Sequence, residues 1–146
     1  MGYRIERGTI VTAFVWCGIM ISPQYQLKEF DKLTSEETRL AVDITNKFYS
    51  EEPDRTIKLD SIEHKAFPEL KKLKEIGDKL PTLILPSKKR SEAKYRSQII
   101  YLQCHFFKLL YLEFKSQNSS KYRPEIESTT DKINDIRREW GKDACY

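Results

Sequence analysis

The stretch Ile99–Phe114, IIYLQCHFFKLLYLEF, decides the fold that this 146-residue chain can adopt. A helix through it is apolar over most of its circumference, at Ile99, Ile100, Leu102, Phe106, Phe107, Leu109, Leu110, Leu112 and Phe114. Such a helix is buried in a core or a partner, or lies in lipid. Gln103, Lys108 and Glu113 make lipid a poor environment for it. We therefore expect this stretch to form the central helix of a bundle.

Three more segments carry apolar residues at helical spacing. The stripes consist of Leu40, Ile44 and Phe48 in residues 33–52, of Leu70, Leu73, Ile76 and Leu80 in residues 60–81, and of Ile126, Ile133, Ile136 and Trp140 in residues 123–142. Four helices with short connections form an antiparallel bundle, so we predict a mostly all-α fold of about four helices. The apolar link PTLILP, residues 81–86, has room for at most one short strand.

Terminal signals indicate where these helices begin and end. Thr34 and Glu37 have the spacing of a capping box, which predicts a helix start at Thr34. Pro124 suits the first helical position of the last helix. Gly77 and Gly141 suit helix ends, because glycine adopts the backbone conformation that closes a helix.

The chain is a third charged overall, but residues 8–27 carry no charge. This run has the length of roughly 20 residues that a transmembrane helix requires, and its densest apolar part is Thr9–Ile21. We favour a single membrane span or an uncleaved signal-anchor. A cleaved secretory signal fits Arg4 and Arg7 before the apolar part, but the expected small-residue cleavage site is missing. A buried element of a soluble core is the third interpretation.

The hydrophobic run sets the domain organisation and the compartment. We assign residues 1–27 to an N-terminal hydrophobic targeting or anchor segment, and residues 28–146 to a helical domain. The protein is then membrane-associated or exported, on an extracytoplasmic side or at an organelle membrane. A soluble cytoplasmic protein is the alternative. Two basic residues, Arg4 and Arg7, precede the run, and two, Lys28 and Lys32, follow it. The distribution of positive charge therefore does not set an orientation in the membrane.

Motifs of catalysis are missing from the sequence. It has no phosphate-binding loop, dinucleotide-binding glycine motif, nucleophile elbow or zinc-protease motif. Cys104 and His105 are neighbours on a helix, so they point about 100° apart and do not face each other. We expect His105 to pack in the core and His64 to be solvated. We predict no enzymatic activity, no cofactor and no metal site.

The three cysteines are Cys17, Cys104 and Cys145, and their spacing does not fit a zinc site. If the last two helices form a hairpin, the tail after Gly141 could turn back to the level of Cys104. A disulfide between Cys104 and Cys145 would then pin the tail to the central helix, in keeping with an oxidising compartment. Two free thiols are the alternative.

One concentrated basic run, SKKRSEAKYR, lies at the start of the central helix. Its charges are Lys88, Lys89, Arg90, Lys94 and Arg96. Positive charge there opposes the helix dipole, so helix stability alone would not select it. The run could contact anionic lipid headgroups or nucleic-acid phosphates, or it could be a solvated face. The net charge of +4 is small for a dedicated nucleic-acid binder.

These features predict a non-enzymatic interaction protein that recognises a protein partner through surface complementarity. Aromatic residues often anchor such interfaces, and the candidates are Tyr95, Tyr101, Tyr111 and Trp140. Two forms fit: an accessory subunit of a membrane complex, or an exported inhibitor or immunity protein. The alternative is a soluble nucleic-acid-binding helical protein that uses Lys88–Arg96. We infer no small-molecule substrate.

Overall fold

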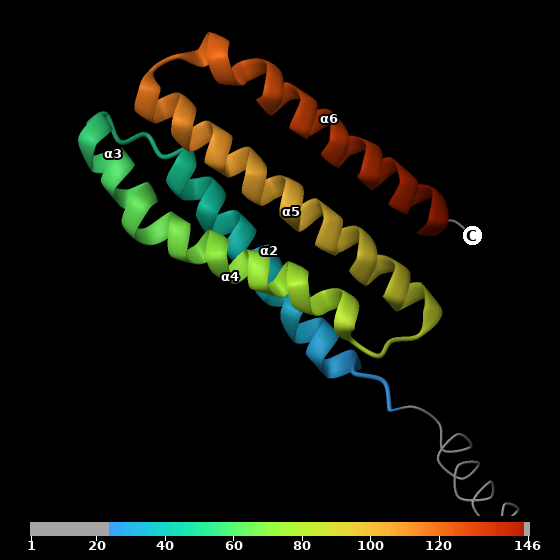
Figure 1. The fold of residues 1–146 in the computed structure, drawn as a ribbon. Helices are drawn as coiled ribbons and strands as arrows, with labels where there is room; N and C mark the ends of the chain where they lie inside the picture. Colours follow the sequence, from blue (N-terminus) through green and yellow to red (C-terminus); the bar gives the residue numbers. More distant parts are fainter. Residues whose placement is uncertain (1–23, 145–146) are drawn as a thin grey trace, which may run out of the picture.

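Helices account for almost all of residues 24–144, the part of the chain that the computed structural model describes. In chain order they are α2 (Leu27–Phe48), α3 (Arg55–Ser61), the π-helical turn η1 (Ile62–Ala66), α4 (Phe67–Lys79), the 3-10 turn η2 (Leu80–Thr82), α5 (Ser87–Ser116) and α6 (Ser119–Ala144). Within the described range there is no strand, and residues 83–86 are an irregular link. Helices α2, α4, α5 and α6 run alternately up and down (Figure 1). The predicted all-α helical bundle is confirmed.

Helix α5 is the centre of the bundle, as its sequence predicts. It contacts α2, α4 and α6, and it lies between α6 and the other helices (Figure 1). Ile100 is completely buried, and Cys104, Phe107 and Leu110 are buried with it. Because neighbours surround α5 on several sides, it can be apolar around most of its circumference without lying in lipid.

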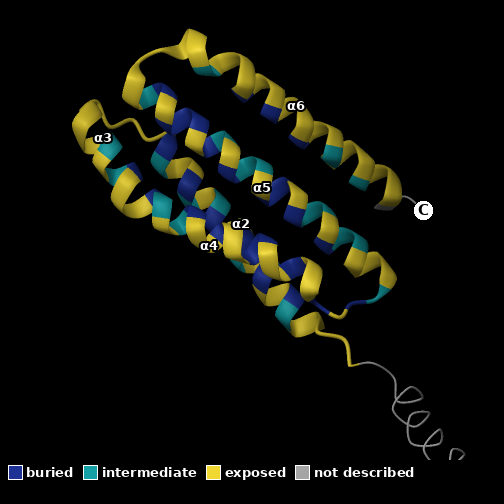
Figure 2. Ribbon diagram, viewed as in Figure 1, coloured by how far each residue is buried: buried dark blue, intermediate teal, exposed yellow. Residues whose placement is uncertain are grey.

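The predicted stripes form the core. Leu40, Ile44 and Phe48 of α2 have no exposed surface, and neither has Leu73 of α4. Burying one such side chain contributes about 1.5–3 kcal/mol, so these stripes hold the helices together. The last helix contributes much less: α6 is exposed over most of its length, and only Ile126 joins the core cluster (Figure 2). The bundle is therefore a core of α2, α4 and α5 with α6 laid against α5.

The predicted helix starts at Thr34 and Pro124 are wrong. Helix α2 begins seven residues before Thr34, whose hydroxyl donates to the carbonyl of Asp31 inside the helix. Pro124 lies inside α6, which begins at Ser119. Asn118 supplies the cap instead, because its side-chain oxygen accepts a hydrogen bond from the amide of Lys121 at 3.2 Å.

The predicted helix ends at Gly77 and Gly141 are also wrong, since both glycines lie inside helices. Gly77 is buried where α4 approaches α5 closely. A Cβ atom there would lie 2.9 Å from Cγ2 of Ile100, so a close approach explains the glycine. Gly141 has nothing within 4 Å of the position of a Cβ atom, and α6 continues past it to Ala144.

Helices α3 and α4 form one bent arm joined by the π-helical turn Ile62–Ala66, in which the amide of Phe67 donates to the carbonyl of Ile62. Asp54 caps the arm by accepting hydrogen bonds from the amides after Arg55. The guanidinium of Arg55 donates to the carbonyl of Phe114 at 3.0 Å and so binds α3 to the last turn of α5.

The described chain begins at Gln24, beside the link that leads into α5. The amide of Gln26 donates to the carbonyl of Ile84 at 2.9 Å, and the amide of Ile84 donates to Oε1 of Gln26 at 3.0 Å. No helix within residues 24–144 is long and apolar enough to cross a membrane. Most of the hydrophobic run 8–27 lies outside the described residues, so its role remains a prediction.

Candidate functional site

A groove of about 190 Å³ runs between α2, α5 and α6. Its lining consists of Ala41 and Thr45 of α2, Gln103, Phe106 and Phe107 of α5, and Thr130, Ile133, Asn134 and Arg137 of α6. The aromatic rings and Ile133 give it an apolar floor, while the polar residues stand around them.

The groove exists because short side chains line it from both α2 and α6. Ala41 and Thr45 are one turn apart on α2, and Thr130 and Asn134 are one turn apart on α6. The hydroxyl of Thr45 donates to the carbonyl of Ala41 at 2.7 Å, and that of Thr130 donates within its own helix. These side chains satisfy their own helices and leave the space between the helices unfilled.

Gln103 is a lining residue of the groove that carries a buried, unsatisfied polar atom. Its side-chain oxygen is buried and accepts no hydrogen bond from any described residue. Leaving a buried acceptor without a donor costs about 1–3 kcal/mol, which a ligand with a donor group would recover. Arg137 is exposed at the rim and is the only ionisable residue of the lining. The groove therefore offers an apolar floor, one acceptor and one positive charge.

The four aromatic residues named from the sequence lie outside this groove and make contacts within the bundle. Tyr95 of α5 stacks on Trp140 of α6, with ring centroids 6.5 Å apart, and its hydroxyl donates to Asp143. The hydroxyl of Tyr101, an exposed residue, donates to Asp78 of α4. Tyr111 is buried against Phe67, and its hydroxyl donates to Glu63.

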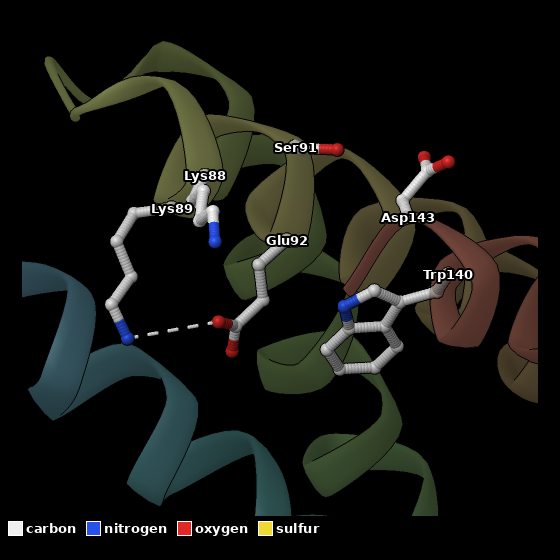
Figure 3. A pocket seen from close by; sticks show the side chains of 6 residues that line it. All are labelled: Lys88, Lys89, Ser91, Glu92, Trp140 and Asp143. Carbon is white, nitrogen blue, oxygen red and sulfur yellow. Dashed lines mark ion pairs between the residues drawn. The ribbon is translucent and has the colours of Figure 1, made fainter. Parts of the chain in front are cut away.

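The basic run divides into two parts. Lys88, Lys89, Arg90 and Lys94 are exposed around the start of α5. Arg96 instead points into the bundle, where its guanidinium binds Glu37 and Glu92. A pocket of about 270 Å³ beside the run is lined by Lys88, Lys89, Ser91, Glu92, Trp140 and Asp143 (Figure 3). Two of the lining residues, Lys89 and Glu92, form an ion pair at 3.7 Å along α5 (Figure 3).

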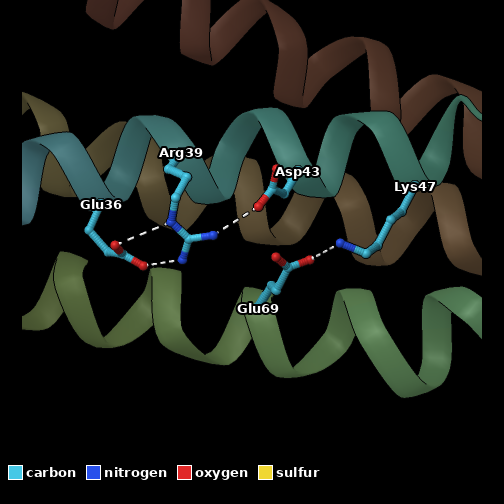
Figure 4. A network of polar contacts seen from close by, with 5 residues as sticks. All are labelled: Glu36, Arg39, Asp43, Lys47 and Glu69. Atoms are coloured by element: carbon cyan, nitrogen blue, oxygen red, sulfur yellow. Dashed lines mark hydrogen bonds and ion pairs between the residues drawn. The ribbon is translucent and has the colours of Figure 1, made fainter.

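A second polar network links α2 to α4 (Figure 4). Arg39 pairs with Glu36 and with Asp43, the latter at 2.9 Å, all within α2. Lys47 of α2 reaches Glu69 of α4 at 2.5 Å and is largely shielded from solvent. Every carboxylate of this network has a basic partner, so we assign it to holding the helices together.

Cys104 is buried on the face of α5 that meets α4, with Sγ 3.8 Å from the carbonyl oxygen of Leu70. Burial raises the pKa of its thiol to about 11. Cys145 lies outside the described residues, so the disulfide remains a prediction. The tail does not turn back at Gly141 as that prediction assumed, because α6 continues and places Asp143 beside Tyr95.

The sequence predicts His64 to be solvated and His105 to be buried, and the structure agrees for one of the two. His64 is exposed, as expected. The expectation that His105 packs in the core is wrong: about half of its side chain is exposed, and Nε2 lies 2.7 Å from Oε2 of Glu125. It lies on the α6 side of α5, where its ring pairs with Glu125 at the surface. Among residues 24–144 no three histidine, cysteine or acidic side chains gather in a way that could hold a metal ion.

The groove is not apparent from the sequence, which marks Gln103 only as a residue that disfavours lipid and Ile133 only as part of a stripe. The available signal was the spacing of small and polar residues, Ala41 with Thr45 and Thr130 with Asn134, on two helices that the bundle brings together. No known protein family, curated protein or solved structure matches the chain.

Proposed function

We propose that this chain is a non-enzymatic interaction protein whose helical domain binds a segment of a partner protein in the groove between α2 and α6. A membrane anchor or export signal within residues 8–27 brings it to its place of action. The observation that carries the proposal is the buried, unsatisfied oxygen of Gln103 beside the apolar floor. A groove that lacks one hydrogen-bond donor is suited to a ligand that brings one.

The size and charge of the groove define the partner segment. An apolar protein cavity of about 150 Å³ takes up benzene, so a groove of about 190 Å³ fits one large apolar side chain. A neighbouring polar group would donate to Gln103, and an acidic residue would pair with Arg137. An amphipathic helix that inserts one apolar residue and carries a carboxylate about one turn away meets these requirements.

Chemistry at this groove is limited to recognition. Its lining has one ionisable side chain, Arg137, and guanidinium groups do not give up a proton in proteins. General acid–base catalysis requires a group that gains and loses a proton in that range. Arg137 supports charge recognition only.

The proposal covers both forms that the sequence suggests. An accessory subunit would find its partner in the membrane fraction, whereas an exported inhibitor or immunity protein would find it in a secreted or extracytoplasmic fraction. The nucleic-acid alternative is weaker, because Arg96 is engaged with Glu37 and Glu92 and leaves the exposed run with four basic residues.

A pair of neighbouring substitutions tests the groove. Ala41→Trp places an indole in the groove, whereas Val42→Trp adds the same side chain at a position that is 53% exposed and outside it. We expect Ala41→Trp to abolish capture of a partner that the wild-type chain and Val42→Trp retain. A photoreactive side chain at Asn134 should crosslink to that same partner. Equal capture by both variants, or crosslinking only outside the groove, would refute the proposal.

A further inference from the structure

The fold places the exit of the hydrophobic run and the basic run at the same end of the bundle. Gln26, near the end of the uncharged residues 8–27, forms two hydrogen bonds with the backbone of Ile84, one through its amide and one through its side-chain oxygen. Helix α5 begins three residues after Ile84, at Ser87, and the basic residues follow at once. Two segments about 60 residues apart in sequence therefore meet, a juxtaposition that the sequence alone does not reveal.

Exposed apolar side chains surround this junction. Tyr25, Leu27 and Ile84 are 48%, 40% and 54% exposed. An aromatic ring and aliphatic side chains beside basic residues are the composition that proteins present to the boundary between water and lipid.

The positive charges at this end have few partners inside the bundle. Lys28, Lys88 and Arg90 are exposed and form no ion pair with another residue of the described range, while Lys89 lies over the ring of Phe30 and pairs with Glu92 at 3.7 Å. The nearby carboxylates are already engaged: Glu29 pairs with Lys79 at 3.0 Å, and Glu92 pairs with Arg96 at 2.8 Å.

Helix stability does not account for three successive basic residues at the start of α5. The positive end of the helix dipole repels them, so a purely structural role would favour acidic side chains there. Charge complementarity with an external anionic surface offers a reason for their position. The apolar residues Tyr25, Leu27 and Ile84 at the same end favour a lipid surface over nucleic acid, whose backbone offers no apolar contact.

We propose that this end of the bundle, formed by Tyr25, Leu27, Lys28, Ile84 and Lys88–Arg90, docks on an anionic lipid surface. The inference rests on the proposed membrane attachment through residues 8–27 for its biological setting, but the lipid contact itself belongs to the described helical domain. Ala41 lies fourteen residues along α2 from Leu27, so the groove is roughly 20 Å along that helix from the docking end.

The test compares two triple variants of the full chain that lose the same charge. In the first, Lys88, Lys89 and Arg90 are replaced by Gln. In the control, Gln replaces Lys65, Lys115 and Lys121, which are exposed elsewhere on the bundle. Binding is titrated on phosphatidylcholine vesicles with and without phosphatidylserine, and the measured quantity is the preference for anionic vesicles.

Each basic residue near an anionic surface strengthens binding about fivefold, so the first variant should lose on the order of 100-fold of that preference. The control should keep most of it. Equal losses in both variants, or a wild-type chain without the preference, would overturn the proposal. Binding of duplex DNA or RNA that requires Lys88–Arg90, without any vesicle preference, would overturn it in favour of nucleic acid.

Two further readouts separate this proposal from membrane anchoring and from misfolding. Binding of the wild-type chain to neutral vesicles reports insertion of residues 8–27. If the chain does not bind neutral vesicles but still prefers anionic ones, the anchor is refuted and the docking end is supported. Lysine acetylation of the wild-type chain needs no variant: anionic vesicles should protect Lys88 and Lys89, but not Lys115 and Lys121. Uniform protection, or none, would contradict the proposal.

Discussion

Arg96 of α5 donates to the carboxylate of Glu37 of α2 at 3.0 Å, and this contact joins two helices through a largely buried ion pair. The same guanidinium holds Glu92 of its own helix at 2.8 Å and lies 5.3 Å from the ring of Trp140 of α6. One side chain thus connects three helices, and a residue that the sequence groups with a surface run belongs to the interior.

Replacing Arg96 by Gln should destabilise the bundle by about 2–3 kcal/mol, because Glu37 would remain buried without its charged partner. Urea unfolding followed by circular dichroism measures the change. Arg39→Gln is the matched control, since the side chains that form the ion pairs of Arg39 with Glu36 and Asp43 are about half exposed, so these pairs should contribute little. Similar losses in the two variants would show that the interior pair has no special weight.

Glu37 should also give the stability a distinctive pH dependence. Burial raises the pKa of Glu37 above its ordinary value, and Arg96 only partly opposes this. A raised pKa means that the folded protein binds this proton more tightly than the unfolded chain. The stabilising contribution is therefore complete below the unfolded pKa and is lost as the pH rises through the folded pKa.

Glu37→Gln isolates that contribution. The free energy of unfolding of the wild-type chain, minus that of the variant, should increase as the pH falls from 7 toward 4. Exposed carboxylates whose pKa values are lowered, such as Glu29 and Asp78, act in the opposite direction in both proteins and cancel. A difference that is constant or that shrinks on acidification would mean that burial does not raise the pKa of Glu37.

Gly77→Ala should destabilise the contact between α4 and α5. The new methyl group would lie 2.9 Å from Ile100 and 3.3 Å from Tyr101, and overpacking of this kind costs about 1–3 kcal/mol. That cost outweighs the gain of up to about 1 kcal/mol from replacing a helical glycine by alanine. Gly141→Ala, with open space around it, should show only the gain. Thermal unfolding should show a lower midpoint for Gly77→Ala and a slightly higher one for Gly141→Ala. A raised midpoint for Gly77→Ala would contradict the close approach of α4 to α5.

The thiol of Cys104 should be nearly unreactive in the folded protein. With a pKa of about 11, roughly 10⁻⁴ of it is thiolate at pH 7, and burial also limits access. A chain in which Cys17 and Cys145 are replaced by Ser leaves Cys104 as its one thiol, and mass spectrometry can follow its alkylation by iodoacetamide. The rate should rise steeply in denaturant, and rapid alkylation without denaturant would refute the buried position.

The predicted disulfide has its own measurement in the unmodified chain. A linked Cys104–Cys145 peptide pair in a non-reducing digest would establish it, and closing a loop of that size contributes on the order of 3–4 kcal/mol. Cys145→Ser should then lower the unfolding midpoint. Two thiols that are both alkylated in the denatured, unreduced protein would show that no bridge forms.

The core was predictable from the sequence because burial follows the period of the helix. Leu40, Ile44 and Phe48 repeat every four residues, and any bundle must cover such a stripe. Helix ends were not predictable in the same way, because local signals compete with tertiary contacts. Thr34 has the sequence of a cap, but the hydrogen bonds of Gln26 with Ile84, which stands 58 residues away, lie at the actual start of α2.

The candidate sites depend on the relation between helices, which no single segment contains. Arg96 and Lys88 share one basic run, yet the rotation of α5 turns the first toward Glu37 and leaves the second exposed. The groove is lined from both α2 and α6, so Ala41 and Thr130 form part of a site only when the bundle brings these two helices together.

The π-helical turn Ile62–Ala66 makes the length of the α3–α4 arm more critical than its composition. A π turn accommodates one residue more than a regular helical path. A chain with one residue deleted here could form an uninterrupted α-helix, but the side chains before the deletion would rotate by about 100° relative to those after it. Arg55 would then turn away from the carbonyl of Phe114. This turn therefore tolerates exchanges of its exposed side chains, whereas a single deletion would undock α3 from the end of α5.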